Sequence, residues 1–159
     1  MRLRNASSSD ADALADFDLG DDATPWLAEV REIVNGLLGW RDDPEAMQED
    51  RRVVVADVDG EIVAVAAHSL FVDTTGRAYP ASRYLMVTAV RIDQQRSSIG
   101  QTLVESLLVD LRNRGCETVE WLVAPGNHAS IAVSRSRFPE AEESQPADVA
   151  PYVQFLLRL

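Results

Sequence analysis

The sequence predicts an α/β (α+β) fold in which helices flank a mixed, mainly antiparallel sheet. Residues 52–72 form two apolar runs separated by Asp59-Gly60, a dipeptide typical of a β-hairpin turn. Val87–Gly115 has the pattern of a buried strand end, a short polar loop and a long amphipathic helix, and another apolar strand follows it. A meander followed by a βαβ unit gives the expected order β-α-α-β-β-β-α-β-α-β, in one domain over residues 1–159.

The first third of the chain is expected to contribute one strand and two helices. Ser7–Ser9 supply candidate N-caps for the first helix, and Asp10 falls in its first turn, where the helix dipole favours acidic groups. Thr24 before Pro25 is a typical start for the second helix. The expected elements are a strand at 2–6, a helix at 11–17, an acidic loop at 19–23, a helix at 25–39 and a polar loop or short helix at 40–52.

The rest of the chain alternates strands with two helices. The meander gains a third strand after Thr74–Pro80, a turn in which Gly76 breaks the apolar pattern. Asn127 is a suitable N-cap for the last helix, and the acidic, proline-bearing segment Phe138–Pro151 is expected to be a loop. The expected elements are strands at 52–58, 61–72, 83–92, 117–123 and 152–159 and helices at 99–114 and 128–137.

The polar loop before the central helix is the strongest candidate for a ligand site. Gln95-Arg96-Ser97-Ser98-Ile99-Gly100 leads directly into the helix, so backbone N–H groups and the positive end of the helix dipole point outward. Such a turn binds anions, most often phosphate. Ser98 with Gln101 three residues later also fits a capping box, in which side chains satisfy these amides without a ligand. The sequence leaves both interpretations open.

The composition restricts the class of partner. The formal net charge is −11 and the isoelectric point is near 4.5, with most of the negative excess in residues 1–61. Nucleic acid is therefore not the expected main partner, because phosphate contacts require clustered cations. The acidic first third suits either a cationic molecule or an ordinary solvated surface.

Several other classes of protein are not expected. No stretch reaches the roughly 18 apolar residues of a membrane span, and the N-terminus lacks the apolar run of a signal peptide, so we expect a cytoplasmic protein without membrane contact. Cys116 is the only cysteine and the two histidines are far apart, so we expect no metal site. The G-x-x-x-x-G-K-[ST] loop of P-loop NTPases and the Gly-x-Ser-x-Gly elbow of hydrolases are both missing.

Motifs along nearly the whole chain resemble those of the GNAT superfamily of acyl-CoA-dependent N-acetyltransferases. Arg4-x-Ala6-Ser7-x-x-Asp10 resembles the first strand and helix start of that family. Val90 precedes Gln95 by five residues, as the fourth strand precedes the pyrophosphate loop in the family. Gln95-x-x-Ser98-x-Gly100 resembles the Q/R-x-x-G-x-G/A signature, and Asn127 resembles the asparagine that follows the fifth strand.

The resemblance implies that acetyl-CoA is the cosubstrate. Backbone groups around Ala89 and Val90 would pair with the pantetheine arm as another strand would, and Asn127 would hydrogen-bond the same arm. The pyrophosphate would be held by backbone amides of Gln95, Arg96, Ser97, Ser98, Ile99, Gly100 and Gln101. The amine acceptor, a small molecule or a peptide, would enter from the side of the first two helices. Many relatives form dimers through edge strands, so a homodimer through an edge at Tyr152–Leu159 is a further expectation.

Three positions depart from the family pattern. Ser98 replaces a signature glycine, and serine adopts a positive φ angle at greater cost. Ser134 stands where many relatives have a tyrosine that protonates the departing thiolate, and its hydroxyl is a weaker acid than a phenol. Tyr84 stands where some relatives carry a carboxylate base. The candidate proton carriers are Ser134 and Tyr84 with His68 and Glu120, and for each a structural role is the stronger interpretation.

The leading hypothesis is direct transfer of an acetyl group from acetyl-CoA to a primary amine, which is cationic if the acidic first third contacts it. Positioning of the reactants, with a hydrogen bond from the Val90 region to the thioester carbonyl, would supply much of the acceleration. The alternative is a catalytically silent relative that binds CoA or a protein partner. A third interpretation is a domain that binds no CoA.

Overall fold

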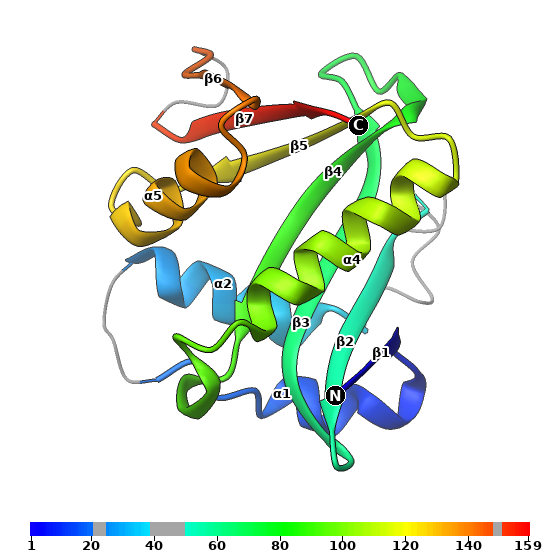
Figure 1. Cartoon of the computed structure of the whole chain (residues 1–159), viewed down its shortest axis with the longest axis vertical. Coiled ribbons are helices and arrows are strands. Elements are labelled where there is room, and N and C mark those ends of the chain that lie inside the picture. The colour runs from blue at the N-terminus through cyan, green and yellow to red at the C-terminus, as the bar shows by residue number, and fades with distance from the viewer. Residues whose placement is uncertain (21–24, 39–49, 148–150) are drawn as a thin grey trace.

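The computed structural model describes residues 1–20, 25–38, 50–147 and 151–159 (Figure 1). These residues form a seven-stranded sheet in the order β1-β2-β3-β4-β5-β7-β6, in which only β4 and β5 pair in parallel. The strands are β1 (Arg2–Asn5), β2 (Arg52–Val58), β3 (Glu61–Val72), β4 (Ala78–Val90), β5 (Thr118–Val123), β6 (Glu142–Ser144) and β7 (Val153–Arg158). The predicted fold class, a mixed and mainly antiparallel sheet with helices, is confirmed.

Helices cover both faces of the sheet. On one face lie α1 (Ala11–Ala15) and α2 (Pro25–Gly36), and on the other lie α4 (Ile99–Asn113) and α5 (His128–Arg137). Figure 1 shows α4 crossing in front of β3 and β4. Each face therefore carries its own hydrophobic core, one between the sheet and α2 and one between the sheet and α4.

Strand β3 lies at the centre of both cores. Ala66 packs in the core with Leu107 of α4, while its neighbour Val65 packs in the opposite core with Val34 of α2. Successive side chains of a strand point to opposite faces, so a strand covered on both sides requires apolar residues throughout. This explains why the sequence of β3 shows no alternation of polar and apolar residues.

The hairpin that joins β3 to β4 is tighter than the sequence predicts. β4 begins at Ala78 rather than Arg83, so the predicted turn Thr74–Pro80 is shorter than expected. Tyr79 pairs with Phe71 across the strands, and its hydroxyl donates a 2.9 Å hydrogen bond to Asp73. This aromatic pair extends the ladder toward the turn.

The prediction that Tyr152–Leu159 forms a sheet edge is wrong. Strand β6 lies inside the predicted loop Phe138–Pro151 and pairs with β7, so β7 is enclosed between β5 and β6. All three residues of β6 are exposed, and no apolar side chain marks the strand in the sequence. The homodimer stays a prediction, with β1 and β6 as the edges among the described residues.

The other element ends either agree with prediction or differ from it by one to three residues. The first helix ends at Ala15 rather than Phe17, because the chain turns there toward the buried Phe17 and Leu19. α2 ends at Gly36. The predicted helix cap at Thr24 and the predicted polar segment that begins at Trp40 lie outside the described residues, apart from the end of that segment at 50–52.

Candidate active site

A β-bulge divides strand β4 at Met86. Val87 pairs with Ala67 and Leu85 pairs with His68, so Met86 is an extra residue with no counterpart on β3. The parallel pairing with β5 ends at the same place, since its last pair is Leu85 with Trp121. Bulges bend a strand and increase its twist. Beyond the bulge β4 continues to Val90 without β5 beside it, so the sheet opens between these strands.

The backbone of β4 beyond the bulge exposes hydrogen-bonding groups to this gap. The Arg91 amide donates a 2.9 Å hydrogen bond to the Val63 carbonyl of β3. Because the direction of these groups alternates along an antiparallel strand, Ala89 also faces β3, while Thr88 and Val90 face away from it. The open side of β4 therefore presents the N–H and C=O groups of Thr88 and Val90, as an unpaired strand edge does.

The loop after β4 has a different backbone from the one that the sequence suggests. A 3-10 turn, η3 (Ile92–Gln94), leads into it, and Arg96 adopts the left-handed conformation with φ of 64°. Ser98 has φ of −77°, an ordinary value for any residue. The expectation that Ser98 adopts a costly positive φ angle is therefore wrong, because the residue with positive φ is Arg96, two positions earlier.

The predicted capping box at Ser98 and Gln101 is also wrong. The Ser98 side chain makes no cap hydrogen bond, and Gln101 Nε2 instead donates to Glu105 Oε1 at 2.6 Å. Ser97 supplies the local contact, since its Oγ accepts from the Ile99 amide at 3.3 Å. Among the described residues no hydrogen bond engages the N–H groups of four residues, Arg96, Ser98, Gly100 and Gln101. The start of the 15-residue helix α4 therefore keeps open donors at its positive end.

Gly100 brings this helix start against the end of β4. A Cβ atom at Gly100 would lie 2.8 Å from Val90 Cγ2, closer than side chains tolerate. Gln95 Nε2 donates to the Val90 carbonyl at 3.3 Å and ties the loop to the same residue. The open amides and the gap beside β4 thus lie next to each other, as a ligand with a diphosphate and an amide-bearing arm would require.

Asn127 caps α5 on the far side of the gap. Its Oδ1 accepts a 3.1 Å hydrogen bond from the Ser130 amide, as the predicted cap requires. The side-chain NH₂ group makes no hydrogen bond within the described part of the chain. The adjacent Gly126 lies close to Trp26 of α2, whose Cδ1 would be 3.6 Å from a Cβ at the glycine. The start of α2 therefore lies beside the loop that carries Asn127.

Ser134 is engaged in the core. It is buried, and its Oγ accepts a 3.0 Å hydrogen bond from the indole Nε1 of Trp121. Trp121 stacks on Phe155 with ring centroids 5.4 Å apart and meets Phe138 edge to face. The hydroxyl thus satisfies a buried N–H group, which would otherwise cost free energy.

Tyr84 and Glu120 lie side by side on the α2 face of the sheet. They are register partners on β4 and β5, one residue before the last pair of the parallel ladder. Glu120 is only 8% exposed, and its Oε2 accepts a 2.7 Å hydrogen bond from Gln154. Burial raises the pKa of the Glu120 carboxyl, and burial followed by the charge of Glu29 raises the pKa of the Tyr84 phenol.

Two further residues of this face were not identified from the sequence. The Tyr152 hydroxyl donates hydrogen bonds of 2.8 and 3.1 Å to the two carboxylate oxygens of Glu29, and so joins the segment just before β7 to α2. The residues are 123 positions apart, and no local pattern pairs them. The only signal was the acidic character of the first third of the chain, to which Glu29 belongs.

His68 lies elsewhere and takes part in a structural network. Its Nδ1 accepts hydrogen bonds from Nε and Nη2 of the buried Arg83, and Arg83 Nη1 pairs with Asp50 at 3.0 Å. Burial and the neighbouring Arg83 and Arg52 charges lower the pKa of His68 to about 4, so its ring is neutral at pH 7. On β3, His68 pairs with Leu85, which precedes the bulge of β4, so His68 lies away from the gap.

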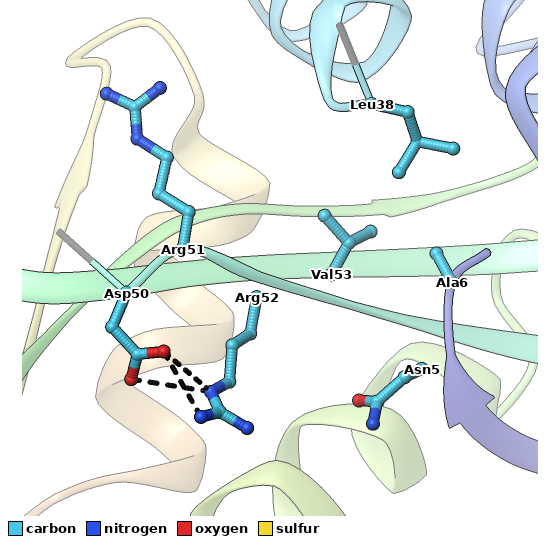
Figure 2. Close-up of a pocket in the computed structure, with 7 residues that line it drawn as sticks. All are labelled: Asn5, Ala6, Leu38, Asp50, Arg51, Arg52 and Val53. Atoms are coloured by element: carbon cyan, nitrogen blue, oxygen red, sulfur yellow. Dashed lines mark hydrogen bonds and ion pairs between the residues drawn. The ribbon is translucent and has the colours of Figure 1, made fainter. Parts of the chain in front are cut away.

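A shallow pocket of about 260 Å³ adjoins this network at the start of β2. Figure 2 shows Asp50 and Arg52 paired at one side of it, with Leu38 and Val53 directed toward each other at the other side. The two arginines, Arg51 and Arg52, point to opposite sides of the strand. Asp50 and Arg52 are thus engaged with each other, and the pocket lies apart from the opening between β4 and β5.

The described residues contain no cluster of histidine, cysteine or acidic side chains that could hold a metal ion. None of their helices has the length and apolar character needed to cross a bilayer.

Comparison with known proteins gives one consistent result. A family model described as the acetyltransferase (GNAT) family matches residues 11–137. No curated protein matches the sequence.

Many solved structures share the fold. The ribosomal-protein-S18-alanine N-acetyltransferase of Escherichia coli superposes with a TM-score of 0.66 at 20% identity over 99% of this chain and 92% of that chain. A GNAT family acetyltransferase of Brucella melitensis in complex with acetyl-CoA gives 0.66 at 20% identity over 99% and 87%. PaiA N-acetyltransferase of Thermoplasma acidophilum in complex with coenzyme A gives 0.70 at 10% identity over 99% and 98%.

Proposed function

The chain belongs to the acetyltransferase (GNAT) family, and we propose that it transfers an acetyl group from acetyl-CoA to a primary amine. The observation that carries this proposal is the gap between β4 and β5, which opens at the Met86 bulge beside the open amides of α4. An unpaired strand edge and an anion site next to each other suit one ligand that has both an amide-bearing arm and a diphosphate.

In this proposal the diphosphate of CoA accepts hydrogen bonds from the amides of Arg96, Ser98, Gly100 and Gln101. The helix dipole of α4 adds a favourable charge interaction. The Thr88 and Val90 backbone groups pair with the arm of CoA, and the free NH₂ group of Asn127 donates to it from the other side of the gap. The close approach at Gly100 keeps these donors near the end of β4.

Acetyl-CoA supplies an acetyl group that is already activated as a thioester. The chain contributes position and a hydrogen-bond donor. Because the Val90 N–H group points into the gap, it can donate to the thioester oxygen, where negative charge develops during attack by the amine. Holding the two reactants together supplies much of the remaining acceleration.

The amine is proposed to approach from the α2 side of the sheet. Tyr84 and Glu120 line that face at the start of the gap, and Glu29 of α2 lies close enough to act on Tyr84. Two carboxylates on this side favour an acceptor that arrives as an ammonium ion.

Two measurements on the full chain test the proposal. Calorimetric titration with CoA should give saturable binding with a Kd in the micromolar range. A thiol-release assay with acetyl-CoA and a panel of primary amines should show release that depends on the amine. Failure to bind CoA at millimolar concentration would contradict the proposal as a whole.

A catalytically silent CoA-binding module is the second candidate. The Ser134 hydroxyl, which stands at the family's proton-donor position, is buried and already bonded to Trp121. Binding of CoA without thiol release, across amines that include peptides with free N-termini, would favour this alternative.

A further inference from the structure

Glu120 is a buried carboxylate without a cationic partner among the described residues. It accepts one hydrogen bond, to Oε2 from the neutral Gln154, and no contact engages Oε1 within that part of the chain. The other buried carboxylate there, Asp10, is 6% exposed and forms a 2.8 Å ion pair with Arg4. Buried charges are normally paired, because desolvation is costly. Unlike Asp10, Glu120 is therefore a buried carboxyl whose charge no side chain of the described residues balances.

Within the described part of the chain, no hydrogen bond or ion pair brings a cation to Glu120. Its register partner on β4 is Tyr84, and its partner on β7 is the apolar Leu156. The titratable groups that act on Tyr84 are the carboxylate of Glu29 on α2, the phenol of Tyr152 just before β7, and Glu120 itself. An ammonium group bound beside Tyr84 would therefore lie near the carboxylates of Glu120 and Glu29.

A mainly apolar pocket of about 300 Å³ lies on the other side of Tyr84. It is lined by the apolar or aromatic residues Leu70, Phe71, Val72, Tyr84 and Met86, together with Ser69 and the basic Arg51. Met86 is the bulge residue where the sheet opens, and Ser69 is the register partner of Tyr84 on β3. Tyr84 thus lies between Glu120 on one side and the apolar pocket on the other.

We infer that the acceptor is a primary amine with an apolar substituent, whose ammonium group binds Glu120 and whose substituent lies in the pocket beside Phe71 and Met86. This inference rests on the proposed function and specifies its substrate class. Such an acceptor differs from a highly charged one such as a polyamine, because the pocket beside Tyr84 presents mainly apolar side chains to the part of the acceptor beyond its ammonium group.

Glu120 also has a chemical part in the inferred reaction. The ammonium group gives one proton to the Glu120 carboxylate, and the freed lone pair forms a C–N bond to the carbonyl carbon of the thioester. The C–S bond then breaks, and the sulfur leaves with its electron pair and takes the second proton from the nitrogen. Glu120 returns its proton to solvent, so the products are the N-acetyl amine, CoA thiol and one proton.

The first experiment compares acceptors with the wild-type chain. We expect kcat/KM for phenethylamine and isoamylamine to exceed that for ethanolamine and spermidine by about tenfold or more, since an apolar group gains that much in a fitting pocket. Phe71→Ala should reduce this preference without abolishing turnover of ethanolamine. A preference for spermidine, or no effect of Phe71→Ala on the ratio, would overturn the assigned substrate class.

The second experiment tests Glu120 with matched variants. Glu120→Gln should lower kcat/KM for phenethylamine by about 10²–10⁴-fold, the usual contribution of a proton acceptor, while the Kd for CoA stays within twofold of wild type. Glu117→Gln makes the same change at an exposed residue three positions earlier and should leave both values unchanged. Glu120→Asp keeps the charge and should retain part of the activity. This variant tests the same role of Glu120 if Glu120→Gln does not fold.

The pH profile separates a chemical role of Glu120 from a structural one. In wild type kcat/KM should fall on the acidic side as Glu120 becomes protonated, and this limb should be missing from Glu120→Gln, which retains Tyr84, Tyr152 and Glu29. Unchanged activity of Glu120→Gln, with normal CoA binding, would refute the inference and leave the proposed function intact. Absence of thiol release by wild type with every amine would refute the proposed function itself.

Discussion

Gly100, at the start of α4, approaches Val90 so closely that a Cβ atom on the glycine would lie 2.8 Å from Val90 Cγ2. This contact joins the first turn of the helix to the last residue of β4. The open amides and the open strand edge are therefore held in a fixed relation by a residue without a side chain.

Gly100→Ala should consequently separate the two parts of the proposed CoA site. The added methyl group overpacks the contact with Val90, and we expect a loss of about 1–3 kcal/mol in the free energy of unfolding. We also expect CoA to bind about tenfold more weakly, because the amides move relative to β4. Denaturant unfolding and calorimetry measure the two effects.

The matched control for this change is Gly36→Ala in α2. A Cβ at Gly36 meets nothing within 4 Å, so alanine there should be neutral or stabilising by up to about 1 kcal/mol. An equal response of the two variants would show that the contact with Val90 carries no special constraint.

Because the positive φ angle lies at Arg96, glycine should stabilise the loop there and not at Ser98. Arg96→Gly should raise the free energy of unfolding by about 0.5–1 kcal/mol, because glycine adopts φ of 64° without strain. Ser98→Gly restores the family residue at φ of −77°, so it should give no gain in stability and leave the Kd for CoA within about twofold. A marked increase in CoA affinity on Ser98→Gly would mean that the loop adopts another conformation when CoA binds.

His68 should make the stability depend on pH. Its pKa is about 4 in the folded chain and about 6.5 when unfolded, so the unfolded state takes up a proton first as the pH falls. The contribution of His68 is complete above pH 6.5 and should decline by about 3 kcal/mol as the pH falls to 4. Free energies of unfolding from urea titrations at several pH values measure this slope.

His68→Gln should remove this part of the slope, since glutamine can still accept a hydrogen bond from Arg83 without binding a proton. His128→Gln is the control, because His128 is exposed at the start of α5. Equal slopes in the wild type and His68→Gln would contradict the buried, neutral state of the ring.

Ser134→Ala should reduce stability rather than turnover. Alanine leaves the Trp121 indole N–H without an acceptor in the core, which costs about 1–3 kcal/mol. We expect kcat to change by less than about threefold, since the hydroxyl is engaged with Trp121. Ser136→Ala, at an exposed site on the same helix, should affect neither value. A large fall in kcat with little loss of stability would instead assign Ser134 a part in proton transfer.

The sequence was sufficient for the parts of the fold that follow from local patterns. The hairpin at Asp59-Gly60, the helix from Ile99 and the cap at Asn127 all depend on residues that are neighbours in the chain. The family signature similarly marked the loop from Gln95 to Gly100, because its spacing is local. Strand alternation and helix periodicity carry this information without reference to the rest of the molecule.

The features that the sequence did not predict depend on distant partners or on single backbone angles. Met86 lies in an apolar run, and nothing in that run marks it as the extra residue of a bulge. Strand β6 has only exposed residues, so its existence depends on β7 beside it. The choice of Ser97 rather than Ser98 as the local hydrogen-bond partner follows from the left-handed turn at Arg96.

Because of the extra residue at Met86, the odd-numbered residues of β4 face one core before the bulge and the other core after it. Before it, Leu85 belongs with the α4 core and Tyr84 with the opposite face; after it, Val87 and Ala89 belong with the α2 core, and Val90 with α4. Deletion of Met86 would make Leu85 and Val87 successive residues opposite His68 and Ala67, so the ladder would become regular, Val87 and Ala89 would keep their layer, and the bend at which the sheet opens would be lost. The bulge residue therefore serves the opening between β4 and β5 rather than the two cores, and a β4 shortened by this residue would keep its core while closing the proposed ligand site.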